Sequence, residues 1–154
     1  MIRAADATIC SVSASHLMAL PPVHSIFVTV ADADIDELQH ANNVAYIRWL
    51  QDVAIAHSNA VGLDFAAYQR LGGVFVVRRQ EVDYLRPVVR GARLELRTWI
   101  EGAMAAKCIR MTEMCSDDGT VVCRAKTTWG YIDIVTARPA RIPQAVRDAF
   151  ALGD

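Results

Sequence analysis

The sequence predicts an α+β domain in which one curved antiparallel sheet wraps around one long helix. Three observations lead to this fold class. Only one long stretch, residues 43–61, has helical character; one short strand candidate precedes it; and most of the chain beyond Gly73 reads as consecutive strands separated by turns. The 154 residues are enough for one domain with one core. We therefore expect a single domain over residues 21–154.

The elements before and within the helix have clear boundary signals. Residues 23–30 form the first expected strand, because β-branched residues follow the Pro21-Pro22 break. An acidic loop over residues 32–39 comes next. The helix then covers residues 43–61 and ends there, because Gly62 is a residue type favoured just after a helix.

The expected helix is apolar almost all the way round, so we expect it to be buried rather than to lie on the surface. Its apolar positions are Val44, Ala45, Ile47, Leu50, Val53, Ala54, Ile55 and Ala56. We expect Tyr46, Ile47, Trp49 and Leu50 to pack in the core or against a second copy of the chain rather than to touch a ligand.

The second half of the chain reads as strands. Residues 74–85 form a long strand that Pro87 ends. Residues 93–101 alternate between apolar and charged side chains, and Gly102-Ala103 is the expected turn after them. Residues 106–116 and 120–134 then form a hairpin.

The hairpin turn is expected at Asp118-Gly119, and a short helix near residues 144–152 closes the chain. A two-residue turn would pair Cys115 with Val122 and Cys123 with Met114, so the two thiols would point to opposite faces of the sheet.

Composition excludes several classes of function. The hydrophobic fraction of 53% and the mean hydropathy of +0.21 argue against disorder, and the net charge of -1 gives no electrostatic reason to bind nucleic acid. No apolar run reaches the length of a membrane span. Residues 1–20 carry no regular period and are expected to form a flexible extension; a secretory signal peptide is a weaker alternative, because Asp6 interrupts its apolar core.

The four cysteines, Cys10, Cys108, Cys115 and Cys123, have no CxxC spacing and no paired histidines nearby. Neither a zinc site nor a disulfide framework is expected. Reduced thiols are typical of a cytosolic protein, so we expect a cytoplasmic location.

A cluster of polar side chains lies directly ahead of the expected helix. It contains the carboxylates Asp34 and Asp36, then His40, Asn42 and Asn43. The N-terminus of a helix offers unpaired N–H groups at the positive end of the helix dipole, where a developing negative charge can be bound. A carboxylate and an imidazole beside such an end form the layout needed to hydrolyse an ester or thioester.

This motif and the order of the elements resemble the hot-dog fold thioesterases, which include 4-hydroxybenzoyl-CoA thioesterase-like enzymes, bacterial acyl-CoA thioesterases and plant acyl-ACP thioesterases. The family pattern runs roughly D-x-D-x-x-x-H-x-N-N-x-x-Y-x-x-W. The chain supplies each fixed position with Asp34, Asp36, His40, Asn42, Asn43, Tyr46 and Trp49. The resemblance covers about residues 23–143 and implies a hot-dog fold.

The resemblance also implies roles for the motif. Asp36 would be the catalytic carboxylate, either attacking the thioester carbonyl or activating water; the alternative is an acidic side chain that merely belongs to the loop. His40 would orient the carboxylate, act as a base or protonate the leaving thiolate, or else bond only to loop backbone. Asp34 is expected to bond to nearby backbone.

The asparagines have compatible structural and functional roles. Both Asn42 and Asn43 are good helix N-caps, and we expect one of them to cap the helix. The resemblance adds the backbone N–H near Asn43 as a donor to the oxyanion and Asn42 as a substrate-binding residue.

The chain departs from the family pattern at three places. Leu38 stands where plant acyl-ACP thioesterases have an asparagine, and Gln39 stands where many bacterial members have glycine. Residues 102–106 are neutral where the family often has basic residues that grip CoA phosphates, with only Lys107 nearby. Both acyl-CoA and acyl-carrier-protein substrates therefore stay open.

The long strand suggests an assembly. Such strands pair across the usual dimer interface of hot-dog proteins, which would bring Arg78, Arg79 and Glu81 to the neighbour's substrate site; the alternative is a solvated face. In a monomer this strand would also leave an unpaired edge. We expect a homodimer or homotetramer with shared sites.

Taken with the resemblance, these observations predict a thioesterase that hydrolyses an acyl-CoA or acyl-carrier-protein thioester without metal or redox cofactor. One alternative is a non-catalytic hot-dog protein that binds acyl thioesters. A weaker alternative is an acyl hydratase or dehydratase on the same fold, since the asparagine-rich motif resembles the thioesterase branch.

Overall fold

The computed structural model describes residues 22–153. The expected N-terminal extension, residues 1–20, and Cys10 lie outside this part of the chain. The elements in chain order are β1 (His24–Thr29), the 3-10 turn η1 (Asp32–Asp34), α1 (Asn43–Ala60), α2 (Phe65–Leu71), β2 (Gly73–Tyr84), β3 (Arg93–Ala103), β4 (Lys107–Ser116), β5 (Val121–Asp133) and α3 (Gln144–Ala149).

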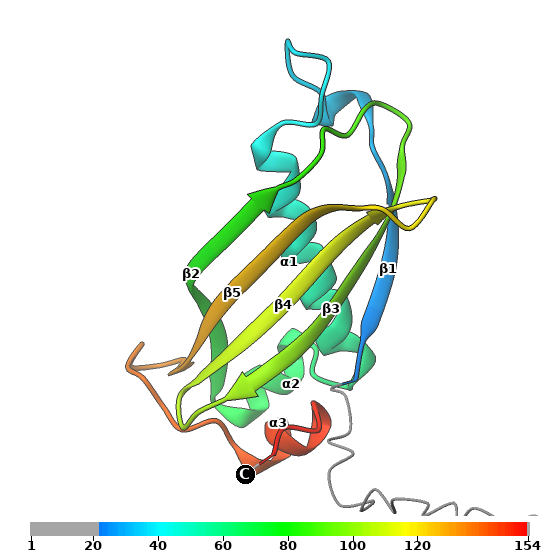
Figure 1. Cartoon of the computed structure of the whole chain (residues 1–154). Helices are drawn as coiled ribbons and strands as arrows, with labels where there is room; N and C mark the ends of the chain where they lie inside the picture. The colour runs from blue at the N-terminus through cyan, green and yellow to red at the C-terminus, as the bar shows by residue number, and fades with distance from the viewer. Residues whose placement is uncertain (1–21, 154) are drawn as a thin grey trace, which may run out of the picture.

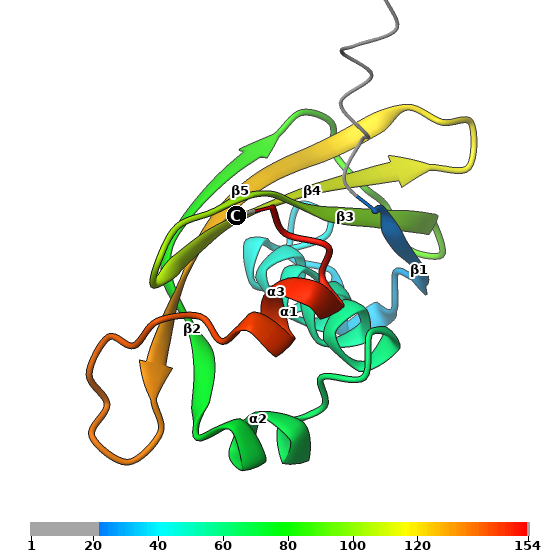
Figure 2. The ribbon, with the colours of Figure 1, turned by 90° about the horizontal axis from the view of Figure 1, so that it is seen from below.

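The strands form one antiparallel sheet in the order β1-β3-β4-β5-β2. The sheet curves over α1, which lies against its concave face, while α2 and α3 lie at the end of the sheet where α1 ends (Figures 1 and 2). The expected α+β hot-dog architecture is confirmed. Because β1 and β2 are the two edge strands, the long strand β2 has one edge without a partner strand among residues 22–153.

The ends of α1 follow from the predicted signals. The Asn42 side chain accepts a hydrogen bond from the Ala45 N–H at 2.9 Å, so Asn42 is the N-cap. Gly62, two residues after the last helical residue, has φ +81°, which glycine adopts at little cost.

One face of α1 forms the main core against the sheet. Its buried members are Ala45, Tyr46, Trp49, Leu50 and Val53, packed against Leu94, Leu96, Met114, Val122, Cys123 and Ala125. The expectation that α1 is buried all round is wrong for the single chain: Val44, Ile47 and Ile55 are exposed, because the sheet covers only one side of the helix.

The short helix α2 was not expected from the sequence. The Asp64 side chain caps it by accepting a hydrogen bond from the Ala67 N–H at 2.8 Å, and Gly72 ends it with φ +75°. Together with α3 it closes the end of the core through a second buried cluster. This cluster contains Ala54, Leu63, Ala67, Tyr68, Ile100, Cys108, Trp129, Tyr131, Ile142, Val146 and Phe150.

Two details of the strands differ from expectation. Gly102-Ala103 is not a turn but continues β3 past a β-bulge, and the chain reverses after it. In the hairpin, Met114 pairs with Cys123 as expected, but a register shift pairs Cys115 with Val121 instead of Val122. The cause is a connection longer than two residues, in which Gly119 has φ +81°.

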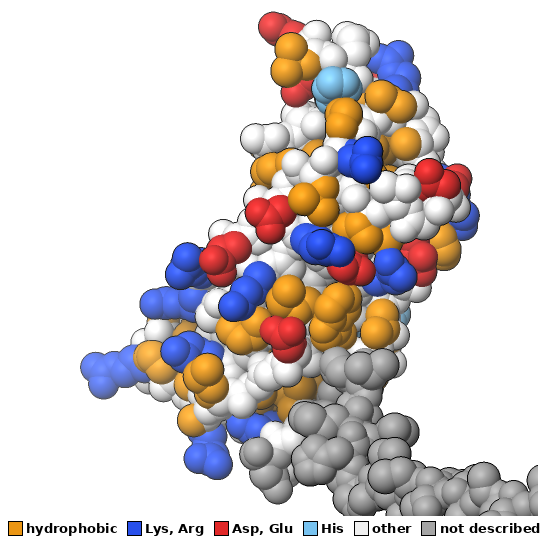
Figure 3. All heavy atoms as spheres, in the orientation of Figure 1, with side chains coloured by type: hydrophobic (Ala, Val, Ile, Leu, Met, Phe, Trp, Pro, Cys, Tyr) orange, Lys and Arg blue, Asp and Glu red, His pale blue; other side chains and the backbone are white. Residues whose placement is uncertain are grey.

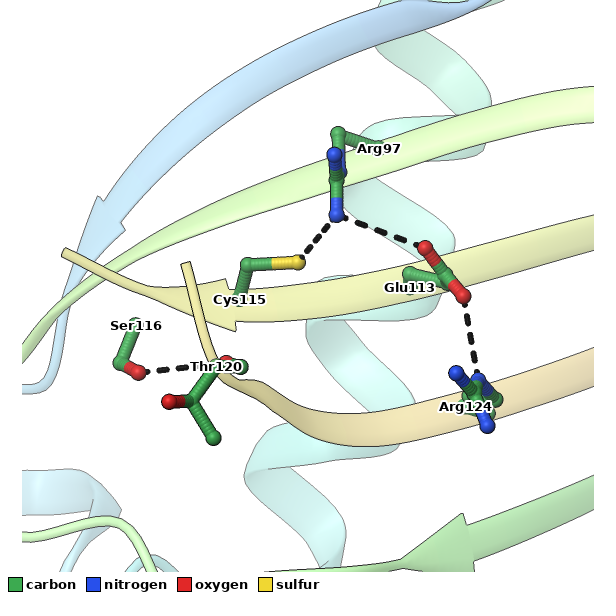
Figure 4. Close-up of polar contacts among 6 residues, drawn as sticks. All are labelled: Arg97, Glu113, Cys115, Ser116, Thr120 and Arg124. Atoms are coloured by element: carbon green, nitrogen blue, oxygen red, sulfur yellow. Dashed lines mark hydrogen bonds and ion pairs between the residues drawn. The ribbon is translucent and has the colours of Figure 1, made fainter. Parts of the chain in front are cut away.

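The convex face of the sheet carries a mixture of charged and apolar side chains (Figure 3). Arg97 joins two strands there, because its Nη2 lies 3.4 Å from a Glu113 carboxylate oxygen and 2.6 Å from Cys115 Sγ (Figure 4). Arg124 contacts the other oxygen of Glu113 at 3.0 Å. This network fastens β3, β4 and β5 on the side away from α1.

None of the helices in the described part of the chain combines the length and apolarity needed to cross a membrane.

Candidate functional site

The loop between η1 and α1 is a tight, hydrogen-bonded reversal. Ile35 and Ala41 form an antiparallel bridge, the Asp36 N–H donates to the His40 carbonyl at 2.9 Å, and the Gln39 N–H donates to the Asp36 carbonyl at 3.0 Å. Gln39 has φ +62°, a conformation that glycine adopts at lower cost. At this position many bacterial members of the family have glycine, and Gln39 adopts the backbone conformation that glycine favours. The loop projects from one end of the molecule, ahead of α1 (Figure 1).

Asp36 is half-buried in this loop. Its Oδ1 accepts a hydrogen bond from the Leu38 N–H at 2.9 Å, which is an Asx-turn contact that orients the carboxylate. No donor within residues 22–153 contacts Oδ2. The carboxylate is therefore held by one oxygen and leaves the other available.

Asp34, in contrast, is a structural residue. The residue is only 2% exposed; Oδ1 accepts from Arg48 Nη2 at 2.6 Å and Oδ2 accepts from the Ala31 N–H at 2.9 Å. Burial alone would raise the pKa of Asp34, but the hydrogen bonds from Arg48 and Ala31 and the charge of Arg48 hold it below its ordinary value. The Asn42 N–H also donates to the Asp34 carbonyl at 2.8 Å, so Asp34 ties the loop to the start of α1.

The N-terminus of α1 keeps free donors. Asn42 caps the Ala45 N–H, and the N–H groups of Asn43 and Val44 have no acceptor among the described residues. Asn43 is exposed as the first residue of the helix. These two N–H groups, at the positive end of an 18-residue helix, are available to an anion.

His40 lies in the same loop and is half-buried. Its carbonyl accepts from the Asp36 N–H, but no hydrogen bond joins its ring to the Asp36 carboxylate in the described part of the chain. The loop therefore brings the two side chains into one reversal without forming a carboxylate–imidazole pair.

Three of the four charged residues of β2, namely Arg78, Arg79 and Glu81, lie apart from this loop in the single chain. Arg79 and Glu81 are exposed and pair with each other, Nη2 to Oε1, at 3.2 Å. Arg78 is the extra residue of a bulge against β5, and its Cγ lies 3.0 Å from where a Cβ on Gly130 would stand. None of the three contacts the Asp36 loop.

A cavity that sequence reasoning missed lies near the other end of α1, between α1, α2 and the sheet, with a volume of about 260 Å³. Its lining is mostly apolar and includes Ala54, Ile55, Leu63, Phe75, Ile100 and Trp129, together with the charged Arg110. A signal for it was present. Arg110 shares the inward-facing positions of β4 with Cys108, Thr112 and Met114, where a charge is out of place.

The family follows from a comparison over most of the described chain. Residues 30–150 match the family model of the thioesterase-like superfamily. The chain belongs to this superfamily. The match includes the Asp36 loop, α1, the whole of β2–β5 and α3.

Individual relatives are distant. Among curated proteins, the chain is 24% identical over 128 residues to the chloroplastic acyl-acyl carrier protein thioesterase ATL2 of Arabidopsis thaliana, covering 82% of this chain and 68% of that protein. Among solved structures, a Staphylococcus aureus protein in complex with CoA has a TM-score of 0.80 at 17% identity, covering 86% and 84% of the two chains.

An acyl-ACP thioesterase from Bacteroides thetaiotaomicron has a TM-score of 0.77 at 15% identity. That comparison covers 86% of this chain but only 54% of the Bacteroides protein, and another matched structure is covered to 53%, so the chain spans about half the length of these two. At such identities the solved structures establish the shared hot-dog fold.

Proposed function

We propose that this protein hydrolyses acyl thioesters of CoA or of an acyl carrier protein at a site formed by Asp36 and the N-terminus of α1. The observation that supports this most is the Asp36 carboxylate, of which only one oxygen accepts a hydrogen bond from the described residues. It lies in a tight loop just ahead of two helix N–H groups that have no acceptor within residues 22–153. One group supplies negative charge or a base, and the other binds the negative charge that develops on the thioester oxygen.

Two routes use these groups. In the first, Asp36 takes a proton from water while the water oxygen bonds to the carbonyl carbon. In the second, Asp36 itself bonds to the carbonyl carbon and gives an acyl-aspartyl anhydride, which water then hydrolyses. In both routes the carbonyl oxygen becomes an oxyanion near the Asn43 and Val44 N–H groups, and the carbon–sulfur bond breaks to release a thiolate that takes up a proton.

His40 is proposed as the proton donor to that thiolate. Its ring lies in the same loop as Asp36 but is not hydrogen-bonded to it, which leaves the ring free to face the departing sulfur rather than to serve the carboxylate. An imidazole can carry and donate a proton, which suits this role.

The site is proposed to be shared between two copies of the chain. One edge of β2 has no partner strand in the described part of the chain, and Val77 on this strand is exposed. Val44, Ile47 and Ile55 on α1 add exposed apolar surface. Antiparallel pairing of β2 with its copy would extend the sheet through a two-fold interface and carry Arg78, Arg79 and Glu81 toward the partner's Asp36 loop. A homodimer, or a tetramer of two such dimers, follows.

The charge around β2 supports a negatively charged thiol carrier. A surface hollow of about 370 Å³ is lined by Arg78, Lys107, Gly130, Tyr131, Ala137 and Pro139. Arg138 and Arg141 are exposed in the adjoining loop, where Figure 3 shows basic side chains gathered at the lower left. Both the phosphates of CoA and an acidic carrier protein would be attracted there.

A cytoplasmic location is proposed on the state of the thiols. Cys108, Cys115 and Cys123 are free and buried, which suits a reducing compartment. The Arabidopsis relative is chloroplastic by name, so the location of this chain is best measured directly by fractionation of its own cells.

The test is release of thiol from a panel of acyl thioesters. Aliphatic and aromatic acyl groups would each be offered on CoA, on acyl carrier protein and on N-acetylcysteamine, with a chromogenic thiol reagent as readout. We expect turnover of at least one acyl class, and a lower KM on CoA or carrier protein than on N-acetylcysteamine. Binding of these thioesters without thiol release would favour the non-catalytic alternative.

A further inference from the structure

The cavity beside α1 and α2 contains a buried cation. Arg110 is 5% exposed on the inward face of β4. Its Nη1 donates to Thr98 Oγ1 at 3.1 Å and contacts His57 Nδ1 at 3.0 Å, and its guanidinium carbon lies 5.8 Å from the Phe150 ring centre. Its Nε is buried without a hydrogen-bond partner. Arginine at such a depth is normally paired with an anion.

No protein anion compensates this charge in the described part of the chain. None of the ion pairs among residues 22–153 includes Arg110. Its titratable neighbours are neutral: burial and the Arg110 charge lower the pKa of His57 to about 4, burial raises the pKa of Cys108 to about 11, and burial raises that of Tyr68. A guanidinium stays charged in proteins, so the cavity wall carries an unpaired positive charge.

The cavity has a mouth and a floor. The lining residues that are exposed mark the mouth, between α1 and α2; they are Gln51, Ile55, Asn59 and Phe65. The buried lining residues mark the floor against the sheet; they include Ile100, Cys108, Arg110 and Trp129. A ligand that enters between the helices would pass apolar walls first and meet the cation last.

In the proposed dimer, the mouth would lie near the partner's Asp36 loop. Tyr84, at the end of β2, contacts Tyr46 in the first turn of α1, with ring centres 5.0 Å apart, whereas Val74 and Phe75, at the start of β2, line the cavity. Within one chain, Asn43 and Ile55 are roughly 18 Å apart along the helix. Antiparallel pairing of β2 with its copy would put the cavity of one protomer next to the α1 N-terminus of the other.

We infer that this cavity takes the far end of the acyl group and that Arg110 selects acyl chains ending in a carboxylate. The inference rests on the proposed thioesterase function and names the substrate class of that site. An apolar chain fits the walls, and a terminal carboxylate supplies both the missing negative charge and acceptors for the guanidinium.

The first experiment compares pairs of thioesters of equal chain length, one ending in a methyl group and one in a carboxylate, on the same thiol. For at least one chain length we expect kcat/KM of the wild-type protein to be about 10- to 100-fold higher for the carboxylate-ended thioester. Equal turnover, or preference for the methyl-ended thioester at every length, would overturn the inference.

The second experiment replaces the cation. Arg110→Met keeps an unbranched side chain and removes the charge, and no ion pair among the described residues is broken by it. The ratio of kcat/KM between the carboxylate-ended and the methyl-ended thioester should fall to near one, because only turnover of the carboxylate-ended thioester is lost. Arg97→Met, on the opposite face of the sheet, is the control and should retain the wild-type preference. An equal effect of Arg110→Met on both thioesters would show that Arg110 has only a structural role and would overturn the inference.

A binding measurement separates failure of this inference from failure of the proposed function. Calorimetry would measure the binding of acyl-N-acetylcysteamine thioesters, one ending in a carboxylate and one in a methyl group. Two proteins would be compared: the Asp36→Asn variant, and the double variant that also carries Arg110→Met. Binding of the carboxylate-ended thioester that depends on Arg110 supports the cavity assignment even if the wild type releases no thiol. Tighter Arg110-dependent binding of a plain fatty acid than of that thioester would make the cavity a product site and overturn the inference.

Discussion

The buried carboxylate of Asp34 makes a stability prediction with a magnitude set by its contacts. Asp34→Ala removes a charge-assisted hydrogen bond to Arg48 of 2.6 Å and leaves the Ala31 N–H without its acceptor. Hydrogen bonds to charged groups contribute about 1.5–3 kcal/mol. Because the Arg48 side chain is 53% exposed, water can solvate the charge left behind, and the cost should stay near that range.

Denaturant unfolding would measure this loss of about 2–3 kcal/mol, which corresponds to a drop in Tm of roughly 4–10 °C for a chain of this size. Asp32→Ala is the matched control. That carboxylate is 81% exposed and pairs only at the surface with Arg90, so its removal should change the free energy of unfolding by less than about 1 kcal/mol.

The effect of Asp34 should also depend on pH. Its folded-state pKa is below the ordinary value of 3.8, so its contribution is complete above that pH and is lost as the pH falls through the folded-state pKa. The difference in unfolding free energy between wild type and Asp34→Asn should therefore shrink in strong acid. Equal stability of wild type and Asp34→Ala at neutral pH would refute the reading of Asp34 as the anchor of the loop.

Three further predictions concern other parts of the molecule. His57 has a folded-state pKa of about 4 against an ordinary 6.5, so between these pH values the unfolded chain binds a proton that the folded chain does not. The free energy of unfolding should therefore fall as the pH drops through this window, by up to about 1.4 kcal/mol per pH unit. His57→Gln should abolish this contribution to the slope, and an unchanged slope would contradict a lowered pKa of His57. Val77→Lys places a charge on the open edge of β2, so light scattering should find a monomer, and this monomer should be inactive. Ser25→Lys, on the opposite edge strand β1, is the control and should keep the wild-type assembly. A fully active Val77→Lys monomer would exclude a shared site. His40→Ala should lower kcat and change the pH–rate profile, because a proton donor is lost; an unchanged rate and profile would show that His40 only supports the loop.

The elements with strong local signals were predictable from the sequence. The Asn42 cap and Gly62 define α1, and the alternation of Leu94, Leu96, Thr98 and Ile100 defines the inner face of β3. These signals are local, because capping and alternation depend on residues a few positions apart.

The features that were missed depend on tertiary contacts. Helix α2 is only seven residues long, too short for a periodic pattern, and forms because Tyr68 and Leu63 complete the second core cluster. The bulge that keeps Gly102 within β3 and the burial of Asp34 likewise follow from pairing and packing partners far along the chain. Arg110 interrupts the apolar inward-facing positions of β4, but only the fold shows that it lines a cavity and has no carboxylate partner among the described residues.

The candidate site divides in the same way. The polar cluster ahead of α1 and its free helix N–H groups could be predicted from residue order. The structure adds that, among the described residues, the His40 ring does not bond to the Asp36 carboxylate. The reach of Arg78, Arg79 and Glu81 to a second copy depends on an interface between chains and remains a prediction.

The most direct test of the central claim is the turnover number of Asp36→Asn beside that of Glu37→Gln. Both changes remove one negative charge from the same loop, but Glu37 is exposed and has no role in the proposed chemistry. On the best acyl thioester of the panel, Asp36→Asn should lower kcat by about 100-fold or more, equivalent to roughly 3 kcal/mol of transition-state stabilisation, while Glu37→Gln stays near the wild-type rate. Near-normal thiol release by a folded Asp36→Asn protein would contradict the account.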